Sequence, residues 1–181
     1  MVSQIKVNEI IKQSGSSITI GESGDTINIA GSAYAAAGDN TPSFSVTLSG
    51  NQSIPTSSWT KLTFDTEFWD TDSAFASNKF TVPSGEGGKY YFGYTTRIQN
   101  LDDQELASIK LYKNGSQADG ERSLAMNYSP GTNKGISVSG FYIDEAVATD
   151  YFEVYAYHTE GASQIAENSG TVFFGYKLIG V

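Results

Sequence analysis

Two short stretches of the chain are rich in carboxylate side chains, the groups best suited to acid–base chemistry or to binding a hard metal ion. They comprise Asp65, Glu67, Asp70, Asp72, Asp102, Asp103 and Glu105. Oxygen ligands suit Ca²⁺, so Asp70 and Asp72 are weak calcium candidates. The stretch lacks the Gly and the distal Glu of a calcium-binding loop, which favours a solvated acidic loop. A carboxylate pair can also hydrolyse a glycosidic bond, but a hydrolase cleft usually needs aromatic platforms and a longer fold.

His158 is the only histidine, so a Ser-His-Asp triad would have to use it as the general base. It follows Phe152, Val154 and Ala156 on the inward-facing phase of a predicted strand, which favours a partly buried or loop-edge histidine. The chain has no nucleophile elbow, no zinc-ligand set and no phosphate-loop glycine spacing. We therefore predict a non-enzymatic protein with no cofactor beyond the weak calcium candidates.

Composition narrows the classes of partner. The chain of 181 residues has no cysteine and a net charge of −9. An acidic surface disfavours nucleic acid, whose phosphates attract basic proteins, and no run of residues is long and apolar enough for membrane insertion. The segment Met1–Lys6 lacks the apolar core of a signal peptide. We expect a protein that is assembled in a cytoplasm.

The strands that must position any site begin near residue 42. Their short length and regular spacing, without a convincing helix, predict an all-β fold with two antiparallel sheets packed as a jelly-roll sandwich. The predicted strands are Ser43–Leu48, Trp59–Asp65, Phe80–Val82, Tyr90–Ile98, Ala107–Lys113, Ser123–Tyr128, Ile136–Ile143, Tyr151–His158 and Thr171–Ile179. Asn114-Gly115 predicts a hairpin with a type I′ turn, because both positions of that turn need positive φ.

Two kinds of strand occur among them. Trp59–Asp65 and Ala107–Lys113 alternate apolar and polar residues, so their sheet should have one wet face. Tyr90–Ile98, Ile136–Ile143 and Thr171–Ile179 carry bulky groups on both faces. We expect these three in the inner sheet, with the sandwich core on one side and neighbouring protomers on the other. Tyr91, Phe173 and Ile179 are the predicted contacts between protomers.

A nine-residue repeat precedes the jelly roll. Each unit is a Ser-Gly turn followed by a short strand, and its paired isoleucines are Ile18, Ile20, Ile27 and Ile29. Two units cannot bury these side chains alone. Three chains side by side would form a trimeric β-prism-like stalk; the alternative is a plain hairpin packed on the main domain. We predict an N-terminal segment over residues 1–31, a small-residue linker over 32–41 and a head over 42–181.

Loop positions offer candidates for recognition. Trp69 and Phe75 lie in a polar stretch, where apolar rings are either binding anchors or plugs at the end of the jelly roll. Asp102 and Asp103 lie in a second predicted loop. We name these four residues as candidate receptor-binding positions.

Several motifs of the head follow one another in a familiar order. They are Phe80-Thr81-Val82-Pro83, Gly88-Lys89-Tyr90-Tyr91-Phe92, Asn114-Gly115, Asp150 just before a strand, and Phe174-Gly175-Tyr176-Lys177-Leu178. Together they resemble the C1q/tumour-necrosis-factor-like domain, which implies a homotrimeric jelly roll that in some members binds calcium. The chain departs from that pattern in a longer turn over residues 84–88 and in Thr149, which replaces a glycine.

The segment Ser17–Ile27 is similar to the openings of structural proteins of marine tailed bacteriophages. The resemblance implies a virion location and a homotrimer that contacts other virion proteins of the capsid or tail. We expect a capsid decoration protein or short head fibre, attached through Ile5, Val7, Ile10 and Ile11, whose head either binds a host-surface polysaccharide or only cements or shields the shell. The alternatives are the receptor-binding tip of a tail fibre and a cellular C1q-like lectin or adhesin.

Overall fold

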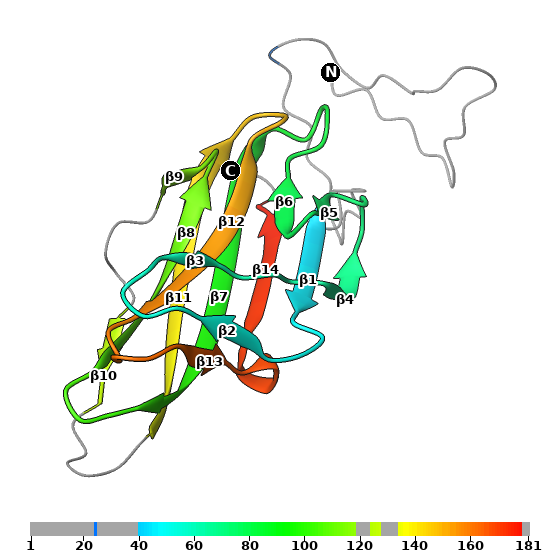
Figure 1. Cartoon of the computed structure of the whole chain (residues 1–181). Coiled ribbons are helices and arrows are strands. Elements are labelled where there is room, and N and C mark those ends of the chain that lie inside the picture. Colours follow the sequence, from blue (N-terminus) through cyan, green and yellow to red (C-terminus); the bar gives the residue numbers. More distant parts are fainter. Residues whose placement is uncertain (1–23, 25–39, 119–123, 128–133, 179–181) are drawn as a thin grey trace, which may run out of the picture. The chain divides into compact units, whose positions relative to one another are not determined.

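The structure is a computed structural model that describes Gly24 and residues 40–118, 124–127 and 134–178 (Figure 1). The chain divides into two compact units, residues 1–36 and 37–181. The predicted stalk isoleucines, the attachment residues and Ile179 lie outside the described residues. Their roles therefore stay predictions. These residues are Ile5, Val7, Ile10, Ile11, Ile18, Ile20, Ile27, Ile29 and Ile179.

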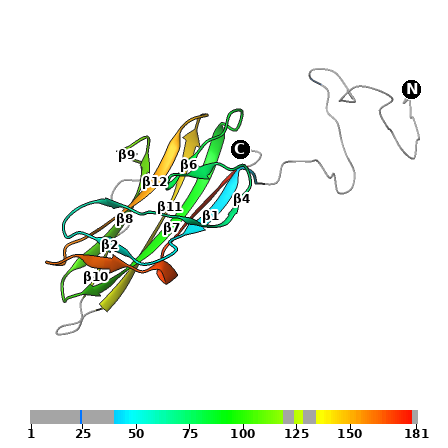
Figure 2. The same ribbon diagram turned by 45° about the vertical axis from the view of Figure 1, so that its right-hand side comes forward.

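The head is built from two seven-stranded antiparallel sheets. We name the first the β7 sheet. It contains β2 (Gln52–Ile54), β13 (Gln164–Ala166), β7 (Gly88–Leu101), β14 (Val172–Lys177), β1 (Ser43–Thr47) and β4 (Thr66–Asp70) in this order, with β11 (Lys134–Ala146) also paired to β7. Its strands β11, β7, β14 and β1 run side by side in both views of the ribbon (Figure 2).

The second sheet, named the β8 sheet, forms the other layer of the sandwich. It contains β10 (Leu124–Met126), β8 (Leu106–Lys113), β12 (Tyr151–His158), β6 (Lys79–Thr81) and β5 (Phe75–Ala76), with β3 (Thr60–Lys61) paired to β12 and β9 (Ser116–Gln117) paired to β8. The predicted jelly roll is confirmed. So is the predicted separation: the strands with two apolar faces, β7, β11 and β14, share one sheet, and alternating β8 lies in the other.

Aromatic rings from both layers fill the space between the sheets. Phe44 of β1 stacks on Phe80 of β6 at 4.7 Å between ring centroids, and Phe92 of β7 meets Phe152 of β12 at 4.2 Å. All four rings are almost fully buried. Burying a phenylalanine side chain stabilises a fold by about 1.5–3 kcal/mol. This aromatic core fixes the inner face of each sheet and so decides which residues point outward.

The predicted strand Trp59–Asp65 is largely wrong. Only Thr60–Lys61 forms a strand, although Leu62 and Phe64 are buried as their alternation suggested. The reason is that the chain leaves one sheet for the other here. The backbone N–H of Leu62 donates to Val154 of the β8 sheet, whereas that of Asp65 donates to Thr47 of the β7 sheet.

The Asn114-Gly115 turn is confirmed, with φ of 52° and 78° at its two residues. The turn contacts Asp150, another residue that carries the family resemblance: the Asn114 side-chain amide donates to the Asp150 carboxylate at 2.7 Å. The Asn114 side-chain oxygen also accepts from the backbone N–H of Tyr151 at 2.9 Å. Thr149 adopts a φ of 78°, so the position where the resemblance expects glycine keeps the conformation that favours glycine.

In the part of the chain that the structure describes, no helix is long and apolar enough to cross a membrane.

Candidate functional site

The outward face of the β7 sheet carries a cluster of large apolar side chains. Antiparallel partners share a face, and Tyr91 pairs with both Ile143 and Tyr176, while Gly93 pairs with Phe141 and Phe174. These side chains therefore lie together on the side of the sheet opposite the core. We call Tyr91, Phe141, Ile143, Phe174 and Tyr176 the aromatic patch.

Tyr91 is the centre of the aromatic patch. Its ring centroid lies 5.4 Å from that of Tyr176, 6.3 Å from Phe174 and 6.5 Å from Phe141. Unlike the core rings, this stack is open on one side: Phe141 is 71% exposed and Ile143 is 54% exposed. A contiguous apolar surface of this kind typically marks a contact site for another macromolecule.

A glycine in the middle of β7 makes this arrangement feasible. A Cβ atom at Gly93 would lie 2.3–2.8 Å from three atoms of the Phe174 ring, closer than real contacts allow. The ring of Phe174 therefore lies directly over the backbone of Gly93. A ring that covers a strand glycine replaces the packing that the missing side chain cannot give.

The apolar surface continues across β1 to the edge strand β4. Trp69 pairs with Ser45 of β1 and is 54% exposed. A groove of about 380 Å³ lies beside it, lined in part by Trp69, Phe174 and Tyr176. Trp69 thus lies on a strand beside the aromatic patch and not at the tip of a loop.

Ion pairs lie on the core-facing phase of the strands that carry the patch, because Asp144 and Lys177 both pair with the buried Tyr90. The Lys113 ammonium lies 3.0 Å from Asp144 and 3.2 Å from Asp150, and Lys177 lies 3.0 Å from Glu86. Burial by itself lowers the pKa of Lys113, but hydrogen bonds to Asp144 and Asp150 outweigh it and raise that pKa overall. These charges are thus paired away from the aromatic patch, and no charged residue belongs to the patch itself.

Tyr91 lies where the sequence predicted a contact between protomers, on the outward face of its strand. Phe173 does not, and its prediction as an interface residue is wrong. It is fully buried and packs 4.8 Å from Phe44 in the core. Both phases of β14 are bulky, so alternation could not tell which one faces inward, and Phe174 and Tyr176 were missed. Only the pairing with β7 identifies the outward residues.

The candidate receptor-binding residues separate in the structure. Phe75 is 6% exposed and packs 5.4 Å from Phe44, so the alternative of a plug at the end of the jelly roll is correct for this residue. Trp69, by contrast, is exposed. Asp102 is exposed and Asp103 half-buried, both just after the end of β7. The structure does not bring Asp102 and Asp103 together with Trp69 into one site.

Asp70, a calcium candidate, is engaged by the turn that leads into β5. Its two carboxylate oxygens accept backbone N–H groups of Ala74 at 3.1 Å and Phe75 at 2.8 Å. The Asp72 carboxylate accepts the hydroxyl of Thr71 at 2.6 Å. Among the described residues, no group of three or more His, Asp or Glu side chains is arranged to hold a metal ion.

His158 points inward as the phase of its strand predicted, but it is fully buried and not partly buried or at a loop edge as expected. Its Nε2 atom lies 2.8 Å from the carbonyl oxygen of Ile54, so the ring links β12 of one sheet to β2 of the other. The other ring nitrogen, Nδ1, has no hydrogen-bond partner in the part of the chain that the structure describes. This geometry gives His158 a structural place between the sheets.

Three solved structures share this architecture. The globular domain of zebrafish complement 1qA matches with a TM-score of 0.52 and 18% identity, over 76% of this chain and 97% of that one. Murine APRIL matches with a TM-score of 0.54 and 12% identity, over 75% and 98% of the two chains. The Eiger TNF of S. frugiperda matches with a TM-score of 0.52 and 14% identity, over 75% and 90%.

The head has the fold of a C1q/tumour-necrosis-factor-like domain. The motifs that suggested this resemblance therefore mark the fold correctly. At this level of identity the C1q-like fold is what the comparison shows. No family model and no curated protein matches the sequence.

Proposed function

We propose that the chain is a non-enzymatic structural protein that assembles as a homotrimer through the aromatic patch of its C1q-like head. The open stack around Tyr91 carries this proposal, because Phe141 stacks on Tyr91, Ile143 pairs with Tyr91, and both Phe141 and Ile143 are largely exposed. The C1q/tumour-necrosis-factor-like fold of the head supports the same assembly, because the resemblance to that family implies a homotrimer. A permanent interface of this type buries about 2,000 Å² or more.

Sedimentation equilibrium of the full chain at micromolar concentration tests the assembly. We expect a single species with three times the mass of the chain. A folded monomer at that concentration would refute the proposal, and a stable dimer would refute the threefold arrangement while keeping the apolar face as an interface.

We further propose that the trimer is part of a tailed bacteriophage particle, as a capsid decoration protein or a short head fibre. The support is the resemblance of Ser17–Ile27 to openings of phage structural proteins and the division of the chain into two compact units. The N-terminal segment would attach to other virion proteins, and the head would face outward.

Labelling of purified particles with antibodies against the head, followed by electron microscopy, tests this location. We expect label over the capsid. Label confined to the end of the tail would favour the receptor-binding tip of a tail fibre, and particles without the chain would refute the virion role.

A cellular C1q-like binding protein is the second candidate, favoured by the similarity of the head to the globular domain of zebrafish complement 1qA. The same antibodies distinguish the two. This candidate predicts label on uninfected cells that carry the gene, whereas the virion proposal predicts label only where particles form.

A further inference from the structure

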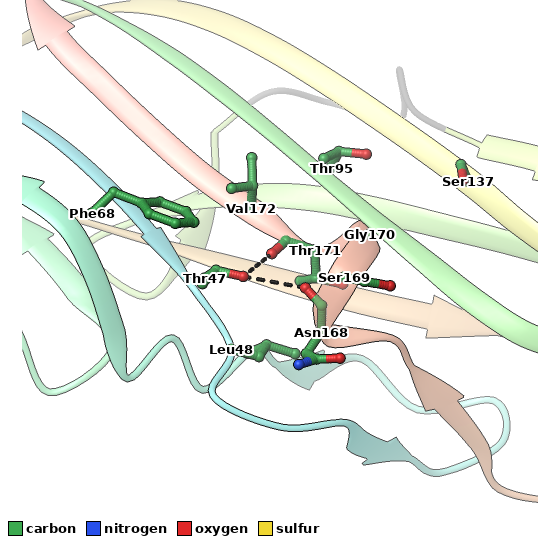
Figure 3. Close-up of a pocket in the computed structure, with 10 residues that line it drawn as sticks. All are labelled: Thr47, Leu48, Phe68, Thr95, Ser137, Asn168, Ser169, Gly170, Thr171 and Val172. Carbon is green, nitrogen blue, oxygen red and sulfur yellow. Dashed lines mark hydrogen bonds between the residues drawn. The ribbon is translucent and has the colours of Figure 1, made fainter.

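An uncharged cleft of about 610 Å³ lies on the same outward face of the β7 sheet as the aromatic patch. It forms where β13 ends and β14 begins, because the 3₁₀ turn η1 (Asn168–Gly170) interrupts the strand edge that faces β7. Its volume falls in the usual range for sites of small ligands, about 300–1,000 Å³. The lining residues are Thr47, Leu48, Phe68, Thr95, Ser137, Asn168, Ser169, Gly170, Thr171 and Val172 (Figure 3).

The floor of the cleft is held in place by hydrogen bonds. The Thr47 hydroxyl lies 2.7 Å from the carbonyl oxygen of Thr171 and 3.2 Å from that of Asn168, the two contacts drawn in Figure 3. The backbone N–H of Asn168 donates to the side-chain oxygen of Asn51 at 3.0 Å. The backbone of the turn is thus held from both sides. A ligand would therefore meet a turn that is already ordered before it binds.

Three polar side chains of the lining are free to bind a ligand. The hydroxyls of Ser137 and Ser169 and the side-chain amide of Asn168 make no hydrogen bond within the described residues. An amide and two hydroxyls supply both donors and acceptors. A ligand with several hydroxyl groups, each able to donate and accept, complements them.

The lining is uncharged, which favours a neutral ligand. None of the ten residues carries a formal charge. Arg97, whose side chain lies against Gly170, is compensated by Glu167, with 3.3 Å between its Nε and a carboxylate oxygen. The whole chain has a net charge of −9, so an anionic ligand would be repelled.

An exposed ring forms one wall of the cleft. Between β1 and β4 the register shifts by a bulge: Ser45 pairs with Trp69 and Val46 with Glu67, so Phe68 is the extra residue. Bulges re-aim side chains, and Phe68 is 62% exposed at the side of the cleft opposite Ser137 (Figure 3). A flat ring beside free hydroxyl and amide groups suits the apolar C–H face of a pyranose sugar.

We propose that this cleft binds a neutral sugar unit, with Phe68 as the stacking platform and Ser137, Asn168 and Ser169 as hydrogen-bonding groups. All ten lining residues belong to one protomer, so the inference rests on no part of the proposed trimer. The cleft would be the binding site for a surface glycan, whether the chain is a virion protein or a cellular lectin. This site lies away from the predicted receptor-binding loops.

Nuclear magnetic resonance titration of the full chain tests the inference. The probes are glucose, galactose, mannose and N-acetylglucosamine, with glucuronate as an anionic comparison. We expect at least one neutral sugar to shift the amide signals of Ser137, Asn168 and Ser169 saturably, with a dissociation constant on the order of millimolar. No saturable shift with any neutral sugar, or tighter binding of glucuronate, would overturn the proposal.

Matched variants locate the site. Phe68→Ala should weaken binding about fivefold or more, which corresponds to about 1 kcal/mol or more, because the sugar loses its aromatic platform, while Phe68→Tyr should retain it. Trp69→Ala is the control, because Trp69 is the adjacent, similarly exposed ring but lines a different groove. Equal losses in Phe68→Ala and Trp69→Ala would overturn the assignment.

Sedimentation of the same samples separates this inference from the proposed assembly. Sugar binding by a monomeric chain would support the cleft while refuting the trimer. Binding that appears only after the trimer is dissociated would show that assembly closes the cleft, and would overturn the inference for the protein as it exists.

Discussion

The two outward faces of the sandwich use similar residues in different ways. On the β8 sheet, the Trp59 ring stacks on Tyr157 at 5.1 Å between ring centroids and carries the Lys110 ammonium 4.3 Å from its own centroid. Nearby, Lys61 and Glu153 form an ion pair at 2.6 Å. The ring and the charged groups on this face therefore already have partners within the chain, so the face needs no other molecule to cover it.

On the β7 sheet, the rings of the aromatic patch contact one another, with Tyr91 at the centre, but no cation covers them among the described residues. Phe141 and Ile143 remain open to solvent. The number of aromatic residues therefore does not mark an interface. The two faces differ in whether a polar or charged group of the same chain covers the aromatic rings.

Phe141→Lys should have the largest effect on the proposed assembly, because it places a charge in the aromatic patch. Three buried and unpaired ammonium groups would weaken assembly by at least about a hundredfold, since an uncompensated charge at an interface costs about 2–5 kcal/mol. The head should stay folded, because Phe141 is 71% exposed. Analytical ultracentrifugation measures the change. Val147→Lys is the control: Val147 is 65% exposed but lies in the turn after β11, and its variant should assemble normally.

Gly93→Ala sharpens the comparison by altering the patch from beneath. The new methyl group would meet the Phe174 ring, and such overpacking costs about 1–3 kcal/mol. We expect a lower melting temperature and weaker assembly together. Adding Phe174→Ala should recover part of the lost stability, because it removes the clash. Gly161→Ala, where a Cβ meets nothing within 4 Å, is the control; an equal loss there would contradict the explanation.

Lys61→Met tests the outward face of the β8 sheet. The substitution leaves the largely buried Glu153 without its cation, at a cost of about 1–3 kcal/mol in the free energy of unfolding. Assembly should not change, because the pair lies on the β8 sheet. Denaturant unfolding and sedimentation measure the two effects separately. Weaker assembly in this variant would show that the β8 sheet also takes part in an interface.

Asp150→Asn should have the smallest effect, and one that depends on pH. The hydrogen bond from Asn114, and then that from the Val147 backbone, lower the pKa of Asp150 below its usual value. A lowered pKa in the folded state gives stability that is present above the pKa of the unfolded chain, about 3.9, and is lost as pH falls through the folded pKa.

The Asp150→Asn variant should therefore be less stable than the parent protein at neutral pH and should approach it below about pH 4. Thermal melting across this range measures the difference. Asp102→Asn is the control, because the carboxylate of Asp102 accepts no hydrogen bond within the described residues. A constant difference for Asp150→Asn at all pH values would contradict this explanation.

Much of the fold was predictable from local pattern. Alternation in β8, the two apolar faces of β7, β11 and β14, and the Asn114-Gly115 turn are properties of neighbouring residues, and they correctly predicted the grouping of these strands and the turn. The wet face expected from the alternation of β8 is wrong at Ser108 and Lys110, which are 8% and 4% exposed. The shortest strands were missed because two or three residues carry no period. Leu62 and Phe64 show the limit: alternation correctly predicted that they are buried, but not that the chain changes sheets there.

The sequence by itself determined the sandwich, its two kinds of sheet and an apolar surface beyond the core, because side-chain period and turn chemistry are local. Only the tertiary structure decided between Phe173 and Phe174 at the outward face, because strand pairing sets the phase when both are bulky. It also brought Phe68, Ser137 and Asn168 around one cleft. These residues come from distant segments, and no spacing along the chain records a contact that a bulge and an interrupted strand edge create.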